Sequence, residues 1–564
     1  MMQGPLSRSV AGLCDALMPQ VSPRTAGGLR EVLRRLDTPL QLAVAGRIKS
    51  GKSTLVNALI GRRVAPTDVG ECTRLVTRFQ YGTVDRIEVV MKDGKRVTIP
   101  FAPDGGIPAD LGGARNGGMA GDGLTAVSHL EAYLTSALLT DVTVIDTPGL
   151  GSMDSASVSR TEALLGAAAQ AGDGAAGRAS DGTGAPDGPD ATEGTGGTGG
   201  TGGTGGTGEL DQVSEFAVAG AEAIVYVFTQ SVRSDDTKVL AAFTAATASR
   251  DAGPVNALAV LNKADTVLAD SVDGSGGDSW RAAEILARSQ AAVLRPRVAD
   301  VLPMNGLLAE TTETGAFTAA DAEALRALAG IDPALFGAMV MAVDLFTSLP
   351  APVDSPARVR LLQLLDLYGI NAAVQILREE PSVSAGELRR RLLARSGLEE
   401  FRRRLGEVFR LRADGIKASA ALASIGALAA SCGDPNERQR VHDGIEMLLQ
   451  RPEAHQLRLL EALTLVSGGA VPMDEELAAE ILRLGGSTRP DDQLGLPGRS
   501  SGELQTAALE RAGWWRSFAA FGATPGQSRV AHVVHRAYFL IWQELRGHQP
   551  AGPPGLAGRA GPQR

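Results

Sequence analysis

The spacing of apolar residues changes character near residue 350. Before that point, short apolar runs typical of buried strands alternate with helical or loop segments, at 41–45, 86–91, 96–100, 141–145, 223–228, 257–261 and 298–304. The second and third runs flank Lys92-Asp-Gly-Lys95, a sequence that favours a hairpin turn. We therefore expect an α/β domain with a mostly parallel, doubly wound sheet that includes an antiparallel hairpin.

After residue 350 the apolar period becomes helical. A representative stripe consists of Leu388, Leu392, Leu398, Phe401, Leu405 and Phe409. A shorter stripe, from Leu29 to Leu36, precedes the first strand. We expect N-terminal helices at 1–38 that pack with the later helices, an α/β domain at 39–350, an all-α bundle at 351–546 and a disordered tail at 547–564.

Amino-acid composition identifies one segment that is not expected to fold, and the net charge argues against one class of protein. Residues 171–208 contain 16 of the 69 glycines and are predicted to be a disordered Gly/Thr-rich insert. The net charge of −9 argues against a dedicated nucleic-acid binder. Three widely spaced cysteines suit a reducing compartment, and no secretory signal or membrane-spanning run is apparent, so we expect a cytoplasmic protein.

The strongest motif follows the first predicted strand. Residues 46–54 read GRIKSGKST, which matches the phosphate-binding loop G-x-x-x-x-G-K-[S/T] and leads into a helical segment. In such a loop backbone N–H groups surround the phosphates, Lys52 contacts the β- and γ-phosphates, and Ser53 binds Mg²⁺. The predicted nucleotide contacts here are Gly46, Lys49, Ser50, Gly51, Lys52, Ser53 and Thr54.

Two further motifs follow later strands in the order expected of a GTP-binding domain. Asp146-Thr-Pro-Gly149 would place a carboxylate near Mg²⁺ and the Gly149 N–H near the γ-phosphate. Asn262-Lys263-Ala-Asp265 reads as the guanine-specificity element, because the Asp265 carboxylate can accept from both N1–H and the N2 amine of guanine. Pro303-Met-Asn305-Gly306, after the last strand, is a weaker candidate that could supply backbone N–H contacts to the guanine carbonyl.

A threonine between the first two motifs is expected to complete the metal site. Thr73 is the preferred candidate for a ligand of Mg²⁺ and for binding the attacking water through its carbonyl, with Thr67 and Thr77 as rivals. The predicted metal set is therefore Ser53, Thr73 and Asp146, and the predicted cofactors are GTP or GDP and Mg²⁺.

These residues, the segments Glu71-Cys-Thr-Arg-Leu-Val-Thr77, Leu367-Tyr-Gly-Ile370 and Arg395-Ser-Gly-Leu398, and the helical C-terminal half together resemble the bacterial dynamin-like GTPases. The three segments named above, with Ala65-Pro-Thr-Asp68, look like those of the isoniazid-inducible dynamin-like proteins of mycobacteria and relatives. The resemblance implies a dynamin-type GTPase head, a helical neck and trunk, and a role in remodelling or stabilising membrane.

Two positions depart from related enzymes. Eukaryotic dynamins carry a Gln and a Ser where this chain has Ile48 and Lys49, so Lys49 is a candidate for supplying the catalytic positive charge. Leu150 follows Gly149 where Ras-like enzymes keep a water-positioning Gln. The predicted catalytic set is therefore Lys52, Thr73, Lys49 and Gly149. We expect slow hydrolysis that quickens when heads pair.

The partners follow from the resemblance and from one basic stretch. Residues 388–414 contain nine arginines and four acids, which suits an anionic membrane surface, although a solvated, ion-paired helix face is the stronger interpretation. Residues 416–431 and the aromatic residues of 514–521 are predicted to pack inside helical cores. We expect peripheral association with the inner face of the plasma membrane, and a homodimer through the heads or a paralogous dynamin-like partner. The alternative is a soluble regulatory GTPase that acts on a protein partner.

Overall fold

The computed structural model describes residues 4–66, 75–108, 127–147, 221–233, 256–294, 297–410, 412–467, 469–487 and 489–547, with residues 237 and 240. The chain divides into two compact units, Met1–Ile445 and Glu446–Arg564. The predicted insert at 171–208 and the tail after residue 547 lie outside the described residues. So does most of a glycine-rich stretch at 104–123.

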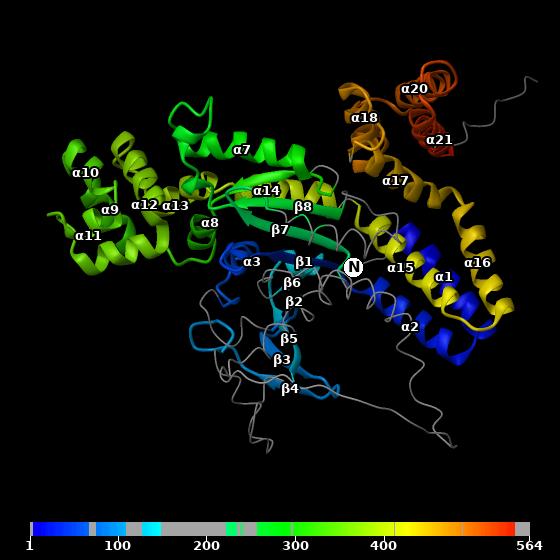
Figure 1. Cartoon of the computed structure of the whole chain (residues 1–564), viewed down its shortest axis with the longest axis horizontal. Coiled ribbons are helices and arrows are strands. Elements are labelled where there is room, and N and C mark those ends of the chain that lie inside the picture. The colour runs from blue at the N-terminus through cyan, green and yellow to red at the C-terminus, as the bar shows by residue number, and fades with distance from the viewer. Residues whose placement is uncertain are drawn as a thin grey trace, which may run out of the picture. The chain divides into compact units, whose positions relative to one another are not determined.

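A nine-stranded sheet forms the centre of the described part of the first unit (Figure 1). Its strands are β1 (Leu40–Gly46), β2 (Thr77–Tyr81), β3 (Arg86–Met91), β4 (Arg96–Ile99), β5 (Val127–Leu134), β6 (Val142–Asp146), β7 (Ala223–Thr229), β8 (Ala257–Asn262) and β9 (Val301–Met304). Their order is β4-β3-β5-β2-β6-β1-β7-β8-β9. Pairing is parallel from β6 through β1, β7 and β8 to β9, and β3 with β4 forms the predicted antiparallel hairpin. The predicted α/β class is confirmed.

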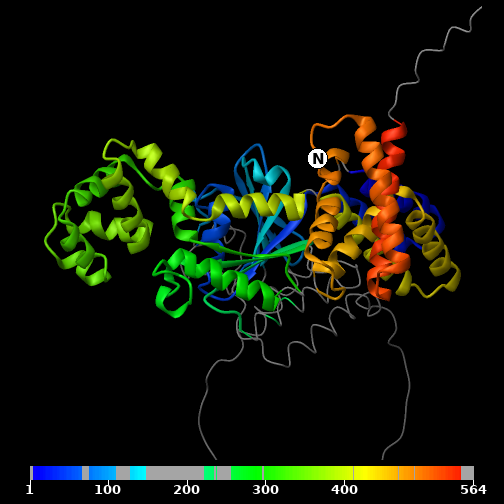
Figure 2. The same cartoon turned by 90° about the horizontal axis from the view of Figure 1, so that it is seen from above.

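Alternate residues of the central strands face two different cores. Leu42 and Val44 belong to the core that includes helix α3 (Lys52–Ile60) and helix α14 (Leu398–Leu405). Ala43 and Ala45 belong to the core of the opposite face, which helix α7 (Ser279–Leu294) covers (Figure 2). A helix from beyond residue 350 therefore completes the α/β domain. The predicted stripe is divided, because Leu388 and Leu392 pack elsewhere.

Those two leucines belong to a helical lobe, which we define as residues 306–394. It contains α8 (Gly306–Glu313), α9 (Ala319–Ala329), α10 (Pro333–Met339), α11 (Val343–Ser348), α12 (Ser355–Glu379) and α13 (Ala385–Ala394). Their shared core includes Phe336, Phe346 and Leu361. Helix α12 is interrupted at Asp366, where φ is 53° and ψ is 179°.

Two N-terminal helices, α1 (Pro5–Leu17) and α2 (Pro23–Asp37), pack against α15 (Ala413–Ala430). The Asp414 carboxylate accepts from the backbone N–H of Leu6 (3.0 Å) and Ser7 (2.9 Å) at the start of α1. The Lys417 ammonium donates to the carbonyls of Arg35 (2.8 Å) and Thr38 at the end of α2. Each charge therefore caps the helix end whose dipole it opposes. Helix α16 (Pro435–Leu449) follows.

The second unit is helical throughout its described part. It contains α17 (His455–Ser467), α18 (Glu475–Gly486), α19 (Pro490–Leu494), α20 (Ser501–Phe521) and α21 (Pro525–Gly547), of which the last two form a hairpin. Trp515 is fully buried, as predicted. The same prediction is wrong for Phe521, which is 92% exposed at the end of α20, and for Trp514, which is 41% exposed.

Candidate nucleotide site

The phosphate-binding motif lies in the turn between β1 and α3. Gly46 has a φ of 153°, and a Cβ there would lie 2.1 Å from the Val227 carbonyl oxygen. Gly51 has a φ of 89°, and a Cβ there would lie 2.2 Å from Asn262 Nδ2. Both motif glycines are therefore required by backbone conformation and by close approach.

Lys52 begins α3 and is only 7% exposed. Its ammonium donates to the Arg47 carbonyl (2.8 Å), so the side chain curls back over the phosphate-binding turn. Burial lowers the pKa of Lys52, and the nearby Asp146 carboxylate opposes that shift. A buried ammonium with one carbonyl partner retains two N–H donors for a phosphate.

Ser53 and Asp146 meet where α3 begins and β6 ends. The Ser53 hydroxyl donates to Asp146 Oδ2 (2.9 Å), while Oδ1 is buried with no partner among the described residues. Burial raises the pKa of Asp146 to about 6, against the Lys52 charge and the Ser53 hydrogen bond. A hydroxyl and a carboxylate with a free oxygen match the oxygen ligands of Mg²⁺. The described residues contain no group of three or more His, Cys, Asp or Glu side chains that could hold a metal ion.

Asn262, at the end of β8, makes hydrogen bonds to the phosphate-binding turn and to the start of α8. Its Nδ2 donates to the Ser50 carbonyl (2.8 Å), and its Oδ1 accepts from the Gly306 N–H (2.9 Å). Gly306 has no room for a side chain, since a Cβ would lie 2.8 Å from Asn262 Oδ1. The phosphate turn and the start of α8 are therefore held by one buried amide.

The predicted base-reading residues lie at the same edge of the sheet. Lys263 is exposed in a left-handed conformation (φ 56°), and Asp265 follows it, half-buried, with a pKa that burial raises. The Asn305 side chain caps α8 by accepting from the Leu308 N–H (3.0 Å), and its backbone N–H donates to the Ser396 carbonyl (2.9 Å). Because that N–H is already engaged, the unpaired donor of Asn305 is its buried side-chain Nδ2.

The remaining predicted residues fall into two groups. Lys49 is exposed at the tip of the phosphate turn with a φ of 64°, and Thr54 is half-buried in the first turn of α3. Thr73 and Gly149 lie outside the described residues, as does the rival Thr67. The other rival, Thr77, is buried in β2 opposite Asp146 in the register of the sheet.

Two residues that support the site were not predicted from the sequence. Ser396 holds Asn305 through its carbonyl, and Asn57 is a buried amide on α3. A signal existed for Asn57, because it is the one polar residue in the apolar run at 55–60. Ser396 lies in the segment Arg395-Ser-Gly-Leu398 that carries the resemblance, but its backbone contact with Asn305 does not follow from the side-chain pattern.

The basic stretch at 388–414 is largely neutralised by acids of the same compact unit. Arg402 pairs with Glu313, and Arg404 pairs with Asp300. The other pairs join Arg390 to Glu387, Arg391 to Glu380 and Glu387, and Arg403 to Glu400 and Glu407. Several of these acids precede residue 388, so the charge balance of the stretch alone overstates its basic character. The ion-paired alternative is favoured. Among the described residues, no helix has the length and apolarity needed to cross a bilayer.

The motif order and this geometry agree with the comparison to known proteins. Residues 42–263 match the model of the Dynamin family. This segment of the chain is therefore similar to the Dynamin family. The Isoniazid-induced protein IniC of Mycobacterium tuberculosis is 28% identical over 492 residues, which is 86% of this chain and 86% of that protein. The Bacterial dynamin-like protein of Nostoc punctiforme is 44% identical over 55 residues, 10% of this chain and 8% of that protein.

Among solved structures, chains from studies of an oligomerised bacterial dynamin pair that senses and tethers membranes were found. One is 12% identical with a TM-score of 0.27 and covers 96% of this chain and 75% of its own. Another is 11% identical with a TM-score of 0.31 and covers 95% of this chain and 90% of its own. The resemblance of this chain to bacterial dynamin-like proteins is thus confirmed by the sequence comparisons.

Proposed function

We propose that this dynamin-like protein binds GTP and GDP and hydrolyses GTP with Mg²⁺. The observation that carries the proposal is the convergence of Lys52, Ser53 and Asp146 on one buried point at the end of β1 and β6. Lys52 would bind the β- and γ-phosphates, and Ser53 and Asp146 would hold Mg²⁺, directly and through a water respectively. When bound, Mg²⁺ would supply positive charge that offsets the charge of the phosphates.

Guanine is selected at the other end of the site. Asp265 accepts from the N1–H and N2 amine of the base, and the Asn305 Nδ2 donor offers a partner to its carbonyl. Adenine presents no pair of donors to a carboxylate, so bound ATP would leave Asp265 buried and unpaired.

Hydrolysis needs groups beyond these binding residues. The backbone carbonyl of Thr73 and the N–H of Gly149 position the attacking water and the γ-phosphate. Lys49 supplies positive charge from the exposed tip of the phosphate turn. Pairing of two heads, or of one head with a paralogue, brings such an exposed tip into a water-excluded interface. Turnover per molecule should therefore rise with protein concentration.

The test is GTP hydrolysis and fluorescent GDP binding by the full chain, with and without Mg²⁺. Lys52→Ala should abolish hydrolysis and weaken binding. Lys95→Ala, which removes an exposed lysine of the β3–β4 turn, should leave both unchanged. A wild-type chain that binds no guanine nucleotide would refute the proposal.

For the membrane role we propose peripheral association with the inner face of the plasma membrane, with remodelling or stabilisation as the outcome. The family similarity supports it, and the end of α20, where Phe521 is 92% exposed, offers an apolar contact. Ion pairs of Arg390, Arg391 and Arg402–Arg404 weaken the basic stretch at 388–414 as a docking surface for anionic lipid. A soluble switch that acts on a protein partner therefore remains the alternative.

Co-sedimentation with anionic vesicles, with and without GTP, separates the two roles. The membrane role predicts binding that Phe521→Asp reduces and that Leu509→Asp, a change at a half-exposed position of the same helix, leaves in place. Absence of vesicle binding in every nucleotide state would leave the soluble switch.

A further inference from the structure

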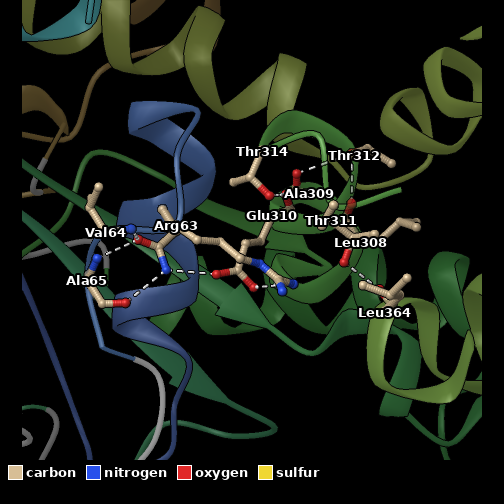
Figure 3. A network of polar contacts seen from close by, with 12 residues as sticks. Arg63, Val64, Ala65, Leu308, Ala309, Glu310, Thr311, Thr312, Thr314 and Leu364 are labelled. Carbon is tan, nitrogen blue, oxygen red and sulfur yellow. Dashed lines mark hydrogen bonds and ion pairs between the residues drawn. The ribbon is translucent and has the colours of Figure 1, made fainter. Parts of the chain in front are cut away.

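A buried polar pair joins α3 to α8 away from the predicted ligands. Asn57 is 1% exposed and Glu310 is 3% exposed, and Asn57 Nδ2 donates to Glu310 Oε1 (2.7 Å). The other Glu310 oxygen accepts from the Arg63 guanidinium (3.4 Å). Figure 3 shows Glu310 on its helix facing Arg63, with Val64 and Ala65 beyond.

The Asn57 amide uses its remaining hydrogen-bonding capacity on the backbone that follows α3. Its Oδ1 accepts from the N–H groups of Val64 (2.9 Å) and Ala65 (2.8 Å), and its Nδ2 also donates to the Ala65 carbonyl (3.0 Å). All three of these hydrogen bonds are buried, so they fix the position of the backbone at 64–65 relative to Asn57.

The pair connects three segments that each belong to the proposed nucleotide site. Helix α3 begins with the phosphate-binding Lys52, and α8 begins beside the base-contacting Asn305. Ala65 lies eight residues before Thr73, the proposed ligand of Mg²⁺. The carboxylate of Glu310 fixes the side-chain rotamer of Asn57, and Asn57 fixes the backbone from which the chain continues toward Thr73.

We propose that Asn57 and Glu310 are positioning residues for GTP hydrolysis: they hold Val64 and Ala65 in fixed register with α3 and α8, and their loss lowers turnover more than nucleotide affinity. The inference rests on the proposed GTPase function. Neither side chain reaches the phosphates through any described contact, so their effect passes through the backbone of 64–65.

Stability alone does not require this pair. Burying a carboxylate costs desolvation, and burial raises the pKa of Glu310. Apolar side chains of similar volume at both positions would fill the same space without that cost. The hydrogen bonds of the pair fix the orientation of the groups that they join, which an apolar contact does not do. A segment that leads to a proposed metal ligand needs such a fixed orientation.

The variants follow from this distinction. Glu310→Met keeps the volume and removes the acceptor, so turnover should fall about tenfold, the loss expected for one hydrogen bond to a charged group. Its fluorescent GDP affinity should stay within about threefold, while its melting temperature reports separately the cost of leaving the buried Asn57 N–H without this acceptor. Glu310→Gln keeps an acceptor for Asn57 and should hydrolyse GTP nearly as fast as the wild type. Glu313→Met, one turn along α8, removes only the ion pair to Arg402 and serves as the matched control.

Equal turnover in Glu310→Met and the wild type would overturn the inference. So would an equal loss of turnover and GDP affinity, or the same loss in the control. If Glu310→Met does not fold, Asn57→Asp tests the proposal instead. It keeps the oxygen that accepts from the N–H groups of Val64 and Ala65, and it replaces the donor to Glu310 and the Ala65 carbonyl by a second oxygen. Unchanged turnover in that variant would equally overturn the proposal. Failure of the proposed function itself would appear in the wild type, which would then lack Mg²⁺-dependent hydrolysis.

Discussion

The second compact unit contains the buried carboxylate of Glu480, and the first contains that of Asp146. The two differ in how many hydrogen-bond donors surround them. In the second unit, Glu480 is 7% exposed and accepts from Arg511 through both oxygens. Its Oε1 also accepts from the Trp515 indole N–H (3.0 Å) and the Tyr538 hydroxyl (2.7 Å). These donors hold the pKa of Glu480 below its usual value despite burial.

In the first unit, Asp146 is 8% exposed but has far fewer partners. Ser53 alone donates to it among the described residues, one oxygen is unpaired, and its pKa rises to about 6. A buried carboxylate with a hydrogen-bond donor for each oxygen stabilises the fold around it, as at Glu480. A buried carboxylate oxygen without a donor destabilises the fold, and a ligand that binds it can relieve that cost. Groups with perturbed pKa values therefore often mark functional sites.

The largest expected effect follows from removing the charge of Asp146. Asp146→Asn keeps the shape but cannot hold a water of Mg²⁺, so turnover should fall about a thousandfold, or about 4 kcal/mol. The free energy of unfolding of the nucleotide-free chain should stay constant or rise, because an uncompensated charge is removed. Hydrolysis assays and chemical denaturation measure the two quantities. If Asp146→Asn lost stability and kept turnover, Asp146 would be a stabilising carboxylate like Glu480, and not part of a ligand site.

The second unit should show the opposite pattern. Glu480→Gln sets an amide N–H group against the Arg511 guanidinium and should destabilise the unit by about 3 kcal/mol. Denaturation followed by tryptophan fluorescence reports mainly this unit, which contains three of the four tryptophans, Trp514, Trp515 and Trp542. Fluorescent GDP binding should be unchanged. Loss of GDP affinity with intact fluorescence would show that Glu480 serves the nucleotide site.

Asp265 lies between Asp146 and Glu480 in this comparison. It is only half-buried, yet burial raises its pKa, as it does for Asp146. Asp265→Asn exchanges an acceptor for a donor and should shift preference from GTP toward XTP by about a hundredfold. Competition of both nucleotides against fluorescent GDP measures the shift. Retained preference for GTP would assign guanine recognition to another residue.

The sequence was sufficient for the α/β class and the motifs, because both depend on local spacing. Glycines 46 and 51 are needed for backbone reasons that the motif itself encodes. The runs at β2 and β5 were not predicted as strands. The most informative miss is α14, whose helical stripe gives no sign that it packs on the sheet rather than on the preceding helices. Amphipathic spacing specifies that a face is buried, not which surface buries it.

The same limit applies to polar partners. Glu480 looks like an ordinary helix glutamate in the sequence, and its donors lie 31, 35 and 58 residues away along the chain. The arginines of 388–414 likewise find acids that are distant in sequence, such as Asp300. Long-range pairing of this kind appears only once the helices are placed in space.

The smallest expected effect is a difference in pH dependence between the two carboxylates. The pKa of Asp146 is raised from 3.8 to about 6, so its burial costs nothing while it is protonated and destabilises the fold as pH rises between those values. Without nucleotide or Mg²⁺, the wild type should therefore gain about 1 kcal/mol relative to Asp146→Asn between pH 7 and pH 5.

Glu480 has the opposite sign, because its pKa is lowered from 4.5. Its contribution is complete above pH 4.5 and is lost only as the pH falls below that value through its folded pKa. The stability difference between the wild type and Glu480→Gln should thus stay constant from pH 7 to pH 5 and shrink in more acidic solution. Denaturation of both variant pairs at pH 7, 5 and 4 compares the slopes. Parallel slopes for the two carboxylates would show that Asp146 is satisfied in solution, and the contrast between a stabilising and a ligand-dependent carboxylate would then be lost.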